Sequence, residues 1–424
     1  MSETRPARLV RLLILCWGYS IHARRRAQLF IDDPRFEVTV VSTHDYGFAG
    51  ARNVLLTAGR QAPAAGANAR KGTFARIPMP VRAFLKSLLN LLGLVSELRS
   101  MARDLATLRD TVHRVNPDAL LLQTLQYPSF LAYRLPRDLP LAVTFWNGDL
   151  TYFAKWTGLE MLLKKRLVVH GLHRANAITV NSQTALDAAV DLGAEPGKIA
   201  LIRYPGADLG LFNPRPKTAA RDRLRITARR VVLCPRGLGD FFNSDIIVEA
   251  AAKAVSRHPD ILLLFISGVG GEEEWQRHLR LAEGLGIADK MRWDGQVPWE
   301  DMPWYYGAAD VMVSVKTADS CPNCMLEAMA CGTPVVMSDT QQNREWVEDG
   351  ANGFLCPPRD PDAVADRIVK VLDNQGGLVD TFARVCLDKV RRDADSATNV
   401  TKIKDLVAGL AERSRNHGGG LPRS

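Results

Sequence analysis

The sequence has no apolar run that reaches the ~18–20 residues needed to span a bilayer. Its first apolar stretch, residues 12–17, follows basic residues, but it is shorter than most signal-peptide cores and no small-residue cleavage site follows it. We therefore expect a buried first strand there. The seven cysteines are an odd number scattered through a large chain, which is typical of reduced thiols and predicts a cytoplasmic protein.

Sequence signatures of the common cofactors and of metal sites are also missing. The turn at residues 267–271 contains Gly268 and Gly270, but Glu273 stands where a dinucleotide fingerprint has its third glycine. The chain has no phosphate-loop signature that ends in Lys-Ser or Lys-Thr. Cys321 and Cys324 have the spacing of metal ligands, yet no second pair follows at a zinc-site interval. We therefore expect neither a cofactor nor a metal.

Positive charge is concentrated in the first half of the chain. The net charge is +9, and residues 1–205 carry 27 Lys and Arg against 15 Asp and Glu. Such an imbalance predicts an anionic partner, and residues 52–99 are the candidate for peripheral contact with an anionic membrane at its inner face. Two alternatives stay open: a solvated basic face, and a core helix over residues 81–99. No aromatic–basic recognition motif is present, so we expect no nucleic acid partner.

Short apolar runs alternate with helical patterns along most of the chain, which predicts α/β architecture with two doubly wound, Rossmann-like domains facing across a cleft. In such sheets ligands lie beyond the carboxyl ends of the strands. The expected divisions are a first domain over residues 1–205, a Pro- and Gly-containing linker over 206–227, a second domain over 228–395, a helix over 396–416 that packs back on the first domain, and a disordered tail over 417–424.

The most informative segment, residues 317–358, begins after a predicted strand. Ser320 can cap a helix there, and the amide groups of Cys321, Asn323 and Cys324 would then form an anion site at its start. Asp319 and Glu327 flank that start, and their carboxylates can accept hydrogen bonds from sugar hydroxyls. A sugar attached to a diphosphate would satisfy both features, whereas the alternative is a solvated acidic pair beside an ordinary helix.

The spacing Asp319-x7-Glu327, followed by Ala-Met-Ala-Cys-Gly-Thr-Pro-Val-Val over residues 328–336, resembles the signature of the retaining glycosyltransferases of family 4, which have the GT-B fold. The resemblance continues in register through residues 343–354 and 360–365. Upstream, residues 267–270, 295–298 and 308–311 are similar to the family's loops and strand before the motif. It is strong over about residues 230–372 and loose before them.

The resemblance implies roles for individual residues. Glu327 would hold ribose hydroxyls, Asp319 would hold the transferred sugar, and Arg236 would neutralise the leaving diphosphate. Gln296 and Val297 would lie near the base. The remaining donor-binding positions that it implies are Gly268, Ser320, Cys321, Asn323, Cys324, Met325 and Leu326.

Two features depart from the family's pattern. The family has a lysine five positions after its arginine, but Phe241 stands there, and Lys316 is the candidate substitute. In the first domain, Trp146-Asn147-Gly148-Asp149 replaces the family's histidine–glycine pair, so Asn147 or Asp149 would contact the sugar. Trp17-Gly18-Tyr19-Ser20 replaces the usual Gly-Gly loop, which places Gly18 and Tyr19 on the acceptor side.

The sequence therefore predicts a metal-independent glycosyltransferase that moves a sugar from a nucleotide sugar to an acceptor hydroxyl with retention of configuration. Glycan, glycolipid or small-molecule glycoside biosynthesis would use such a reaction. The catalytic candidates are Arg236, Lys316, Asp319 and Glu327. A nucleotide-sugar epimerase of the same fold and a non-catalytic sugar-nucleotide binding protein are the alternatives.

Overall fold

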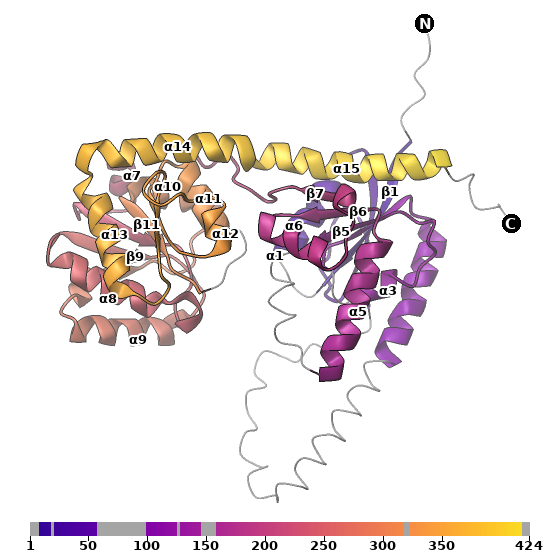
Figure 1. Cartoon of the computed structure of the whole chain (residues 1–424), viewed down its shortest axis with the longest axis horizontal. Coiled ribbons are helices and arrows are strands. Elements are labelled where there is room, and N and C mark those ends of the chain that lie inside the picture. The colour runs from indigo at the N-terminus through magenta and orange to yellow at the C-terminus, as the bar shows by residue number, and fades with distance from the viewer. Residues whose placement is uncertain are drawn as a thin grey trace, which may run out of the picture. The chain divides into compact units, whose positions relative to one another are not determined.

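The computed structural model describes residues 8–17, 21–56, 99–124, 128–145, 158–317 and 322–417 (Figure 1). The chain divides into two compact units. The first unit comprises Met1–Val180, Ala185–Ala200 and Ile403–Ser424, and the second comprises Asn181–Thr184 and Leu201–Lys402. Within the described residues, no helix is both long and apolar enough to cross a membrane.

The first unit is built on a sheet in the order β3-β2-β1-β4-β5-β6-β7, in which β1 pairs in parallel with both β2 and β4. Its central strands are apolar because helices cover the sheet; all residues of β4 and β5 are buried. Its strands are β1 (Val10–Cys16), β2 (Phe36–Ser42), β3 (Arg52–Leu55), β4 (Ala119–Leu122), β5 (Leu141–Phe145), β6 (Ala177–Val180) and β7 (Ile199–Leu201). Its helices include α1 (Ile21–Ile31), α3 (Ser129–Ala132), α5 (Gly158–Arg174), α6 (Gln183–Asp191) and a helical stretch over residues 99–115.

The second unit is built on a parallel sheet in the order β10-β9-β8-β11-β12-β13. The strand order reverses between β8 and β11, and the carboxyl end of the sheet at such a switch point is where ligands of α/β folds bind. The strands are β8 (Arg230–Cys234), β9 (Ile261–Phe265), β10 (Met291–Trp293), β11 (Val311–Ser314), β12 (Val335–Ser338) and β13 (Phe354–Cys356).

Two apolar clusters cover the two faces of this second sheet. One cluster contains Val232, Leu263 and Val313, and it includes side chains of α8, α9 and α13. The other contains Val231 and Leu233, and it includes side chains of α7, α10 and α11 (Figure 1). The helices of this unit are α7 (Lys217–Arg223), α8 (Ser244–Val255), α9 (Gly271–Gly284), α10 (Met302–Ala308), α11 (Asn323–Ala330), α12 (Gln341–Arg344), α13 (Pro361–Asp373) and α14 (Leu378–Asp393). The predicted fold class, two doubly wound α/β units, is confirmed.

Residues 206–227 are not a linker, contrary to the expectation. They contain α7, and Ala207, Phe212 and Ala220 are buried in the apolar cluster of the second unit. Asp310, at the start of β11, accepts from Arg221 at 2.6 Å and ties α7 to the sheet. The prolines and glycines of this segment shape turns between buried residues, so it is part of the second unit's core.

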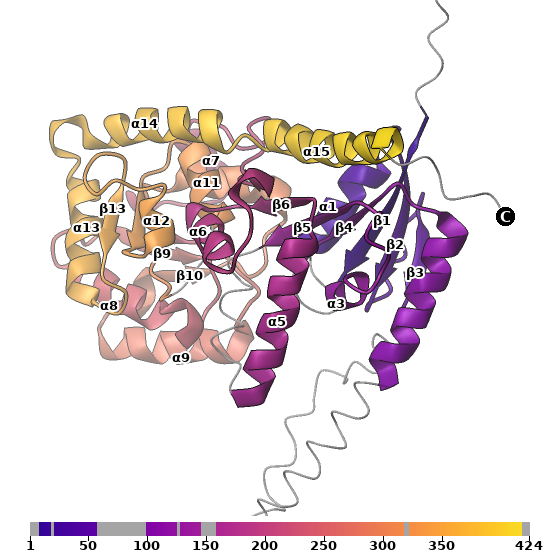
Figure 2. The ribbon, with the colours of Figure 1, turned by 45° about the vertical axis from the view of Figure 1, so that its right-hand side comes forward.

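The last helix, α15 (Ser396–His417), belongs to the first unit from Ile403 onward. Figure 2 shows it passing over β1 and α1. Arg415 bonds Asp118 at 2.6 Å, and Lys404 bonds Asp33 at 3.1 Å. The predicted tail covers residues 417–424, but His417 is the last residue of α15. Residues 418–424 lie outside the described part of the chain, as do residues 57–98, which are most of the predicted membrane segment.

Candidate functional site

Two cationic side chains follow the two strands at the switch point of the second unit. Arg236 comes two residues after β8, and its Nη1 donates to the Sγ of Cys324 in α11 at 3.6 Å. Lys316 comes two residues after β11 and is only 5% exposed. Its Nζ lies 4.4 Å from the ring centroid of Phe241 and 5.5 Å from that of Phe242. Because β8 and β11 are neighbours, both cations lie at one edge of the sheet.

The loop that carries Arg236 is held in one conformation by close contacts. A side chain at Gly237 would collide with the ring of Phe242, since a Cβ there would lie 2.3 Å from the ring. The N–H of Gly239 donates to the Oγ of Ser244 at 2.7 Å, and that Oγ is 2.7 Å from the Nε2 of His278. The loop is therefore anchored to both α8 and α9, which favours a fixed position for Arg236.

Glu327 presents a buried, oriented carboxylate on α11. Its side chain is 8% exposed, its Oε1 accepts from the indole Nε1 of Trp299 at 3.2 Å, and its Oε2 accepts from the hydroxyl of Tyr306 at 2.9 Å. Burial, and after it the charge of Glu327, raises the pKa of the Tyr306 hydroxyl well above its usual value, so this hydroxyl remains a donor.

The predicted base-side residues are also brought together. A Cβ added at Gly268 would lie 3.0 Å from the Cβ of Gln296, so only glycine fits there without displacing that side chain. The loop containing Gly268 is tied to the loop of Arg236 because the N–H of Leu238 donates to the carbonyl of Val269 at 2.9 Å. Gln296 is exposed and Val297 is half-buried. The loops after β8, β9 and β10 therefore form one continuous rim.

The start of α11 fits an anion less completely than the sequence predicts. The amides of Met325 and Leu326 already donate to the carbonyl of Pro322, at 3.0 and 3.4 Å, and both side chains are fully buried. These two residues are therefore packed in the core, and their N–H groups are used within the helix. Any amide contact from this helix has to come from positions before Met325, such as Asn323 and Cys324.

Several predicted site residues lie outside the described residues. These are Gly18, Tyr19, Asn147, Asp149, Asp319, Ser320 and Cys321. Within the described ranges, no group of three or more His, Cys, Asp or Glu side chains could hold a metal ion. Burial raises the pKa of the Cys234 thiol to about 12 and that of the Cys331 thiol to about 12, so these two thiols are not reactive at neutral pH.

Trp299 and Tyr306 are site residues that sequence reasoning missed. Aromatic side chains such as these are typical of the core. Tyr305 and Tyr306 are also adjacent in the sequence, so residue type does not tell them apart. The signal that could have found Tyr306 is helical phase: it shares the side of α10 that packs on α11, whereas the hydroxyl of Tyr305 donates to Asp294 at 2.9 Å.

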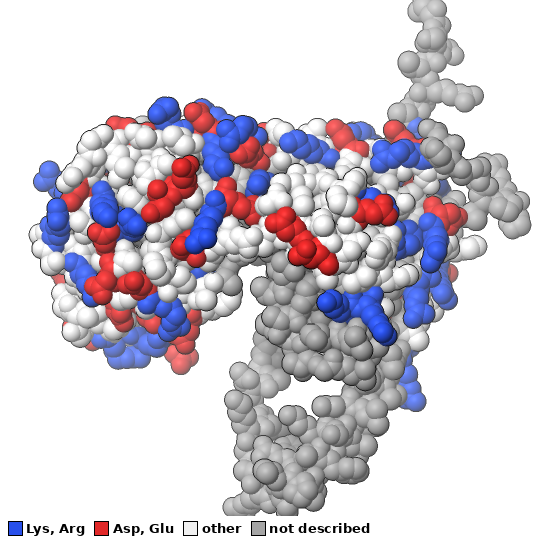
Figure 3. All heavy atoms as spheres, in the orientation of Figure 1, with Lys and Arg blue, Asp and Glu red and all other residues white. Residues whose placement is uncertain are grey.

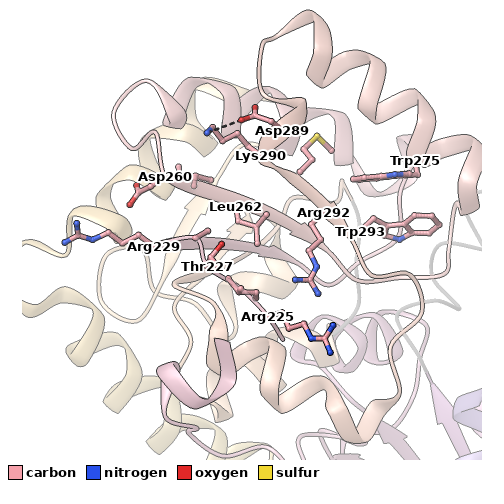
Figure 4. A pocket seen from close by; sticks show the side chains of 14 residues that line it. Arg225, Thr227, Arg229, Asp260, Leu262, Trp275, Asp289, Lys290, Arg292 and Trp293 are labelled. Carbon is pink, nitrogen blue, oxygen red and sulfur yellow. Dashed lines mark ion pairs between the residues drawn. The ribbon is translucent and has the colours of Figure 1, made fainter. Parts of the chain in front are cut away.

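A separate open pocket of about 860 Å³ lies at the other end of the sheet. Its lining includes the residues that precede β8, β9 and β10. Figure 4 shows Arg225 and Arg292 at one side and the tilted pair of rings of Trp275 and Trp293 at the other. Arg292 is neutralised by Asp294 at 2.7 Å, and Lys290 lies 3.3 Å from Asp289. On the face of the second unit seen in Figure 3, acidic and basic side chains are similarly interspersed. This pocket is not the predicted site.

Two family models together cover most of the chain. The model for glycosyl transferases group 1 matches residues 229–374, and the model for the glycosyl transferase 4-like domain matches residues 31–205. The chain belongs to the group 1 glycosyltransferases. The order of the two models follows the two units, with the group 1 model on the unit that contains Arg236, Lys316 and Glu327.

Curated relatives match about half of this chain. A D-inositol 3-phosphate glycosyltransferase from Geodermatophilus obscurus is 38% identical over 207 residues, which are 47% of this chain and 46% of the relative. A second, from Catenulispora acidiphila, is 31% identical over 233 residues, which are 53% of this chain and 54% of the relative. The chain thus spans about half the length of the curated relatives it matches.

Solved structures match over almost the whole chain. Anabaena HepE in complex with UDP superposes with a TM-score of 0.70 at 19% identity and covers 95% of this chain and 100% of its own. Sucrose-phosphate synthase from Thermosynechococcus elongatus gives 0.67 at 17% identity and covers 95% and 99%. At these identities the likeness shows the fold, which is GT-B.

Proposed function

We propose that this protein transfers a sugar from a nucleoside diphosphate sugar to an acceptor hydroxyl, with retention of configuration and without a metal. The observation that carries the proposal is the grouping of two cations, Arg236 and Lys316, with the oriented carboxylate of Glu327 at the switch point of the second unit. A nucleotide sugar needs this combination, because its diphosphate is anionic and its ribose donates hydrogen bonds. HepE, of the same fold, was solved with UDP and with UDP-glucose, which makes UDP-sugars the first donors to test.

The rate would come mainly from stabilising the charge that develops on the leaving diphosphate. Arg236 and Lys316 are placed before the reaction by packed loops, so little reorganisation is needed when that charge appears. In a retaining transfer of this kind, the leaving phosphate oxygen can itself take the proton of the acceptor hydroxyl. The protein groups then bind and orient the two substrates.

Lys316 takes the place of the family lysine that Phe241 replaces. The ammonium of Lys316 lies over the ring of Phe241. A positive charge is therefore present beside position 241, although Phe241 itself is uncharged. The phenyl rings of Phe241 and Phe242 stabilise the ammonium in a largely buried position. In this chain the positive charge is therefore supplied by Lys316, after β11, instead of by a lysine in the loop after β8.

The first unit binds the acceptor in this proposal. Its half of the chain carries 27 Lys and Arg against 15 Asp and Glu, which favours an acceptor that carries phosphate or lies in an anionic membrane. The matched relatives are named for inositol 3-phosphate, a phosphorylated polyol of this kind. A cytoplasmic location, with contact at the inner membrane face, stays a prediction.

The test is turnover of UDP-, GDP- and ADP-sugars by purified protein with phosphorylated polyol and lipid acceptors. We expect nucleotide release to depend on the acceptor and to fall by roughly 10- to 150-fold in Arg236→Ala and in Glu327→Ala, since each loses a charged interaction. The matched control is Arg225→Ala, which changes an exposed arginine at the opposite end of the sheet. Donor turnover without acceptor would favour the epimerase, and nucleotide binding without any turnover would favour the binding protein.

A further inference from the structure

Each oxygen of the Glu327 carboxylate accepts a hydrogen bond from a protein side chain, and these two donors come from different elements. The indole of Trp299, in the 3-10 turn η5 (Trp299–Asp301), donates to Oε1 at 3.2 Å. The hydroxyl of Tyr306, in α10, donates to Oε2 at 2.9 Å. Two donors on opposite oxygens fix both the direction and the plane of the carboxylate.

The two donors are themselves held in place. The ring of Phe212 packs against Trp299 with centroids 5.4 Å apart and against Tyr306 with centroids 6.1 Å apart. The Oγ1 of Thr333 donates to the carbonyl of Tyr306 at 2.8 Å, and Tyr306 is fully buried. The packing therefore holds the two donors and the carboxylate together as one rigid group. A glutamate on the surface would have no such support.

Fixing a carboxylate matters when the ligand presents hydroxyls at set positions on a ring. A carboxylate in a defined plane meets such hydroxyls without losing rotational freedom on binding, whereas a rotating one loses it. A ligand that lacks one hydroxyl leaves part of a buried, charged acceptor unsatisfied, and this is costly. Discrimination between ligands with and without that hydroxyl thus depends on how firmly the carboxylate is held.

We propose that Trp299 and Tyr306 are positioning residues that aim Glu327 at the ribose of the bound nucleotide and thereby set a preference for ribonucleotides over 2′-deoxyribonucleotides. This inference rests on the proposed function, since it needs a nucleotide at the site. It assigns a specificity role to two aromatic side chains that do not themselves touch the reacting atoms.

The experiment measures dissociation constants by calorimetry for UDP, GDP and ADP and for their 2′-deoxy counterparts, with the full chain. We expect the wild type to bind its preferred ribonucleotide on the order of 10-fold or more tightly than the deoxy form, as for a hydrogen bond to a charged group. In Tyr306→Phe this ratio falls towards 1, mainly because the ribonucleotide is bound more weakly. Trp299→Phe should reduce the ratio in the same way.

Tyr305→Phe is the matched control. It removes the hydroxyl of the neighbouring buried tyrosine, which bonds Asp294 instead of Glu327, and it should leave the ratio at the wild-type value. Thermal unfolding of each variant checks the fold, and Trp299→Phe carries the test if Tyr306→Phe does not fold. A wild-type ratio in both Tyr306→Phe and Trp299→Phe, with the ratio lost in Glu327→Ala, would overturn this inference and leave the proposed function intact. No binding of any nucleotide by the wild type would overturn both.

Discussion

Replacing Lys316 by methionine should weaken nucleotide binding without unfolding the protein. Lys316 is 5% exposed, and its ammonium lies 4.4 Å from the ring centroid of Phe241, an arrangement worth about 0.5–2 kcal/mol to the folded state. Burying an ammonium also costs free energy, which methionine, of similar length, does not. The two terms oppose each other, so we expect the free energy of unfolding to change by no more than about 1 kcal/mol.

For diphosphate binding, no opposing term offsets the loss of the Lys316 ammonium. A hydrogen bond between an ammonium and a phosphate oxygen contributes about 1.5–3 kcal/mol, so the dissociation constant for UDP should rise by roughly 10- to 150-fold in Lys316→Met. The loss should be smaller for UMP, which has one phosphate fewer. Calorimetry gives the binding constants, and urea unfolding gives the stability.

The control is Lys290→Met, at the opposite end of the same sheet, where the lysine pairs with Asp289 at 3.3 Å. Its affinity for UDP should equal that of the wild type. Lys316 does not bind the diphosphate if Lys316→Met binds UDP as tightly as the wild type does. A loss of several kcal/mol of stability in this variant would instead show that Lys316 is needed in the core.

Two further predictions concern stability. Burial would raise the pKa of Asp118, but hydrogen bonds from Arg11 and Arg415 outweigh it and lower the pKa to about 2, so this carboxylate contributes about 2 kcal/mol above pH ~4 that is lost as the pH falls towards 2. Urea unfolding between pH 2 and 7 should show this acid loss in the wild type and a smaller one in Asp118→Asn; equal pH slopes would contradict it. Gly270→Ala places a Cβ 2.7 Å from the carbonyl oxygen of Leu238 at a φ of +101°, and should cost roughly 1–3 kcal/mol by thermal unfolding, whereas Gly284→Ala, with open space around it, should not destabilise the protein.

The features of this chain that depend on local sequence could be predicted, and those that depend on packing could not. Asp360 followed by Pro361 predicts a helix start, and the structure has the side chain of Asp360 accepting from the N–H of Ala363 at 3.0 Å. Arg236 and Lys316 could be placed at one edge because each follows an apolar strand, and parallel strands end together.

The linker prediction failed because proline and glycine indicate turns but do not reveal burial. Phe212 is 1% exposed, and its environment comes from Trp299 and Tyr306, which are far along the sequence. The same holds for the partners of Glu327, since a glutamate inside a helix gives no sign of which aromatic groups will donate to it. The carboxylate could be predicted as a site residue, but its orientation is a property of the packed core.

A crystal structure of the protein with bound UDP tests the central claim most directly. We expect the diphosphate beside Arg236, Lys316 and the start of α11, with the ribose against the carboxylate of Glu327 and the base near Gln296. UDP bound instead in the pocket at the amino ends of β8, β9 and β10, with the switch point between β8 and β11 unoccupied, would contradict it.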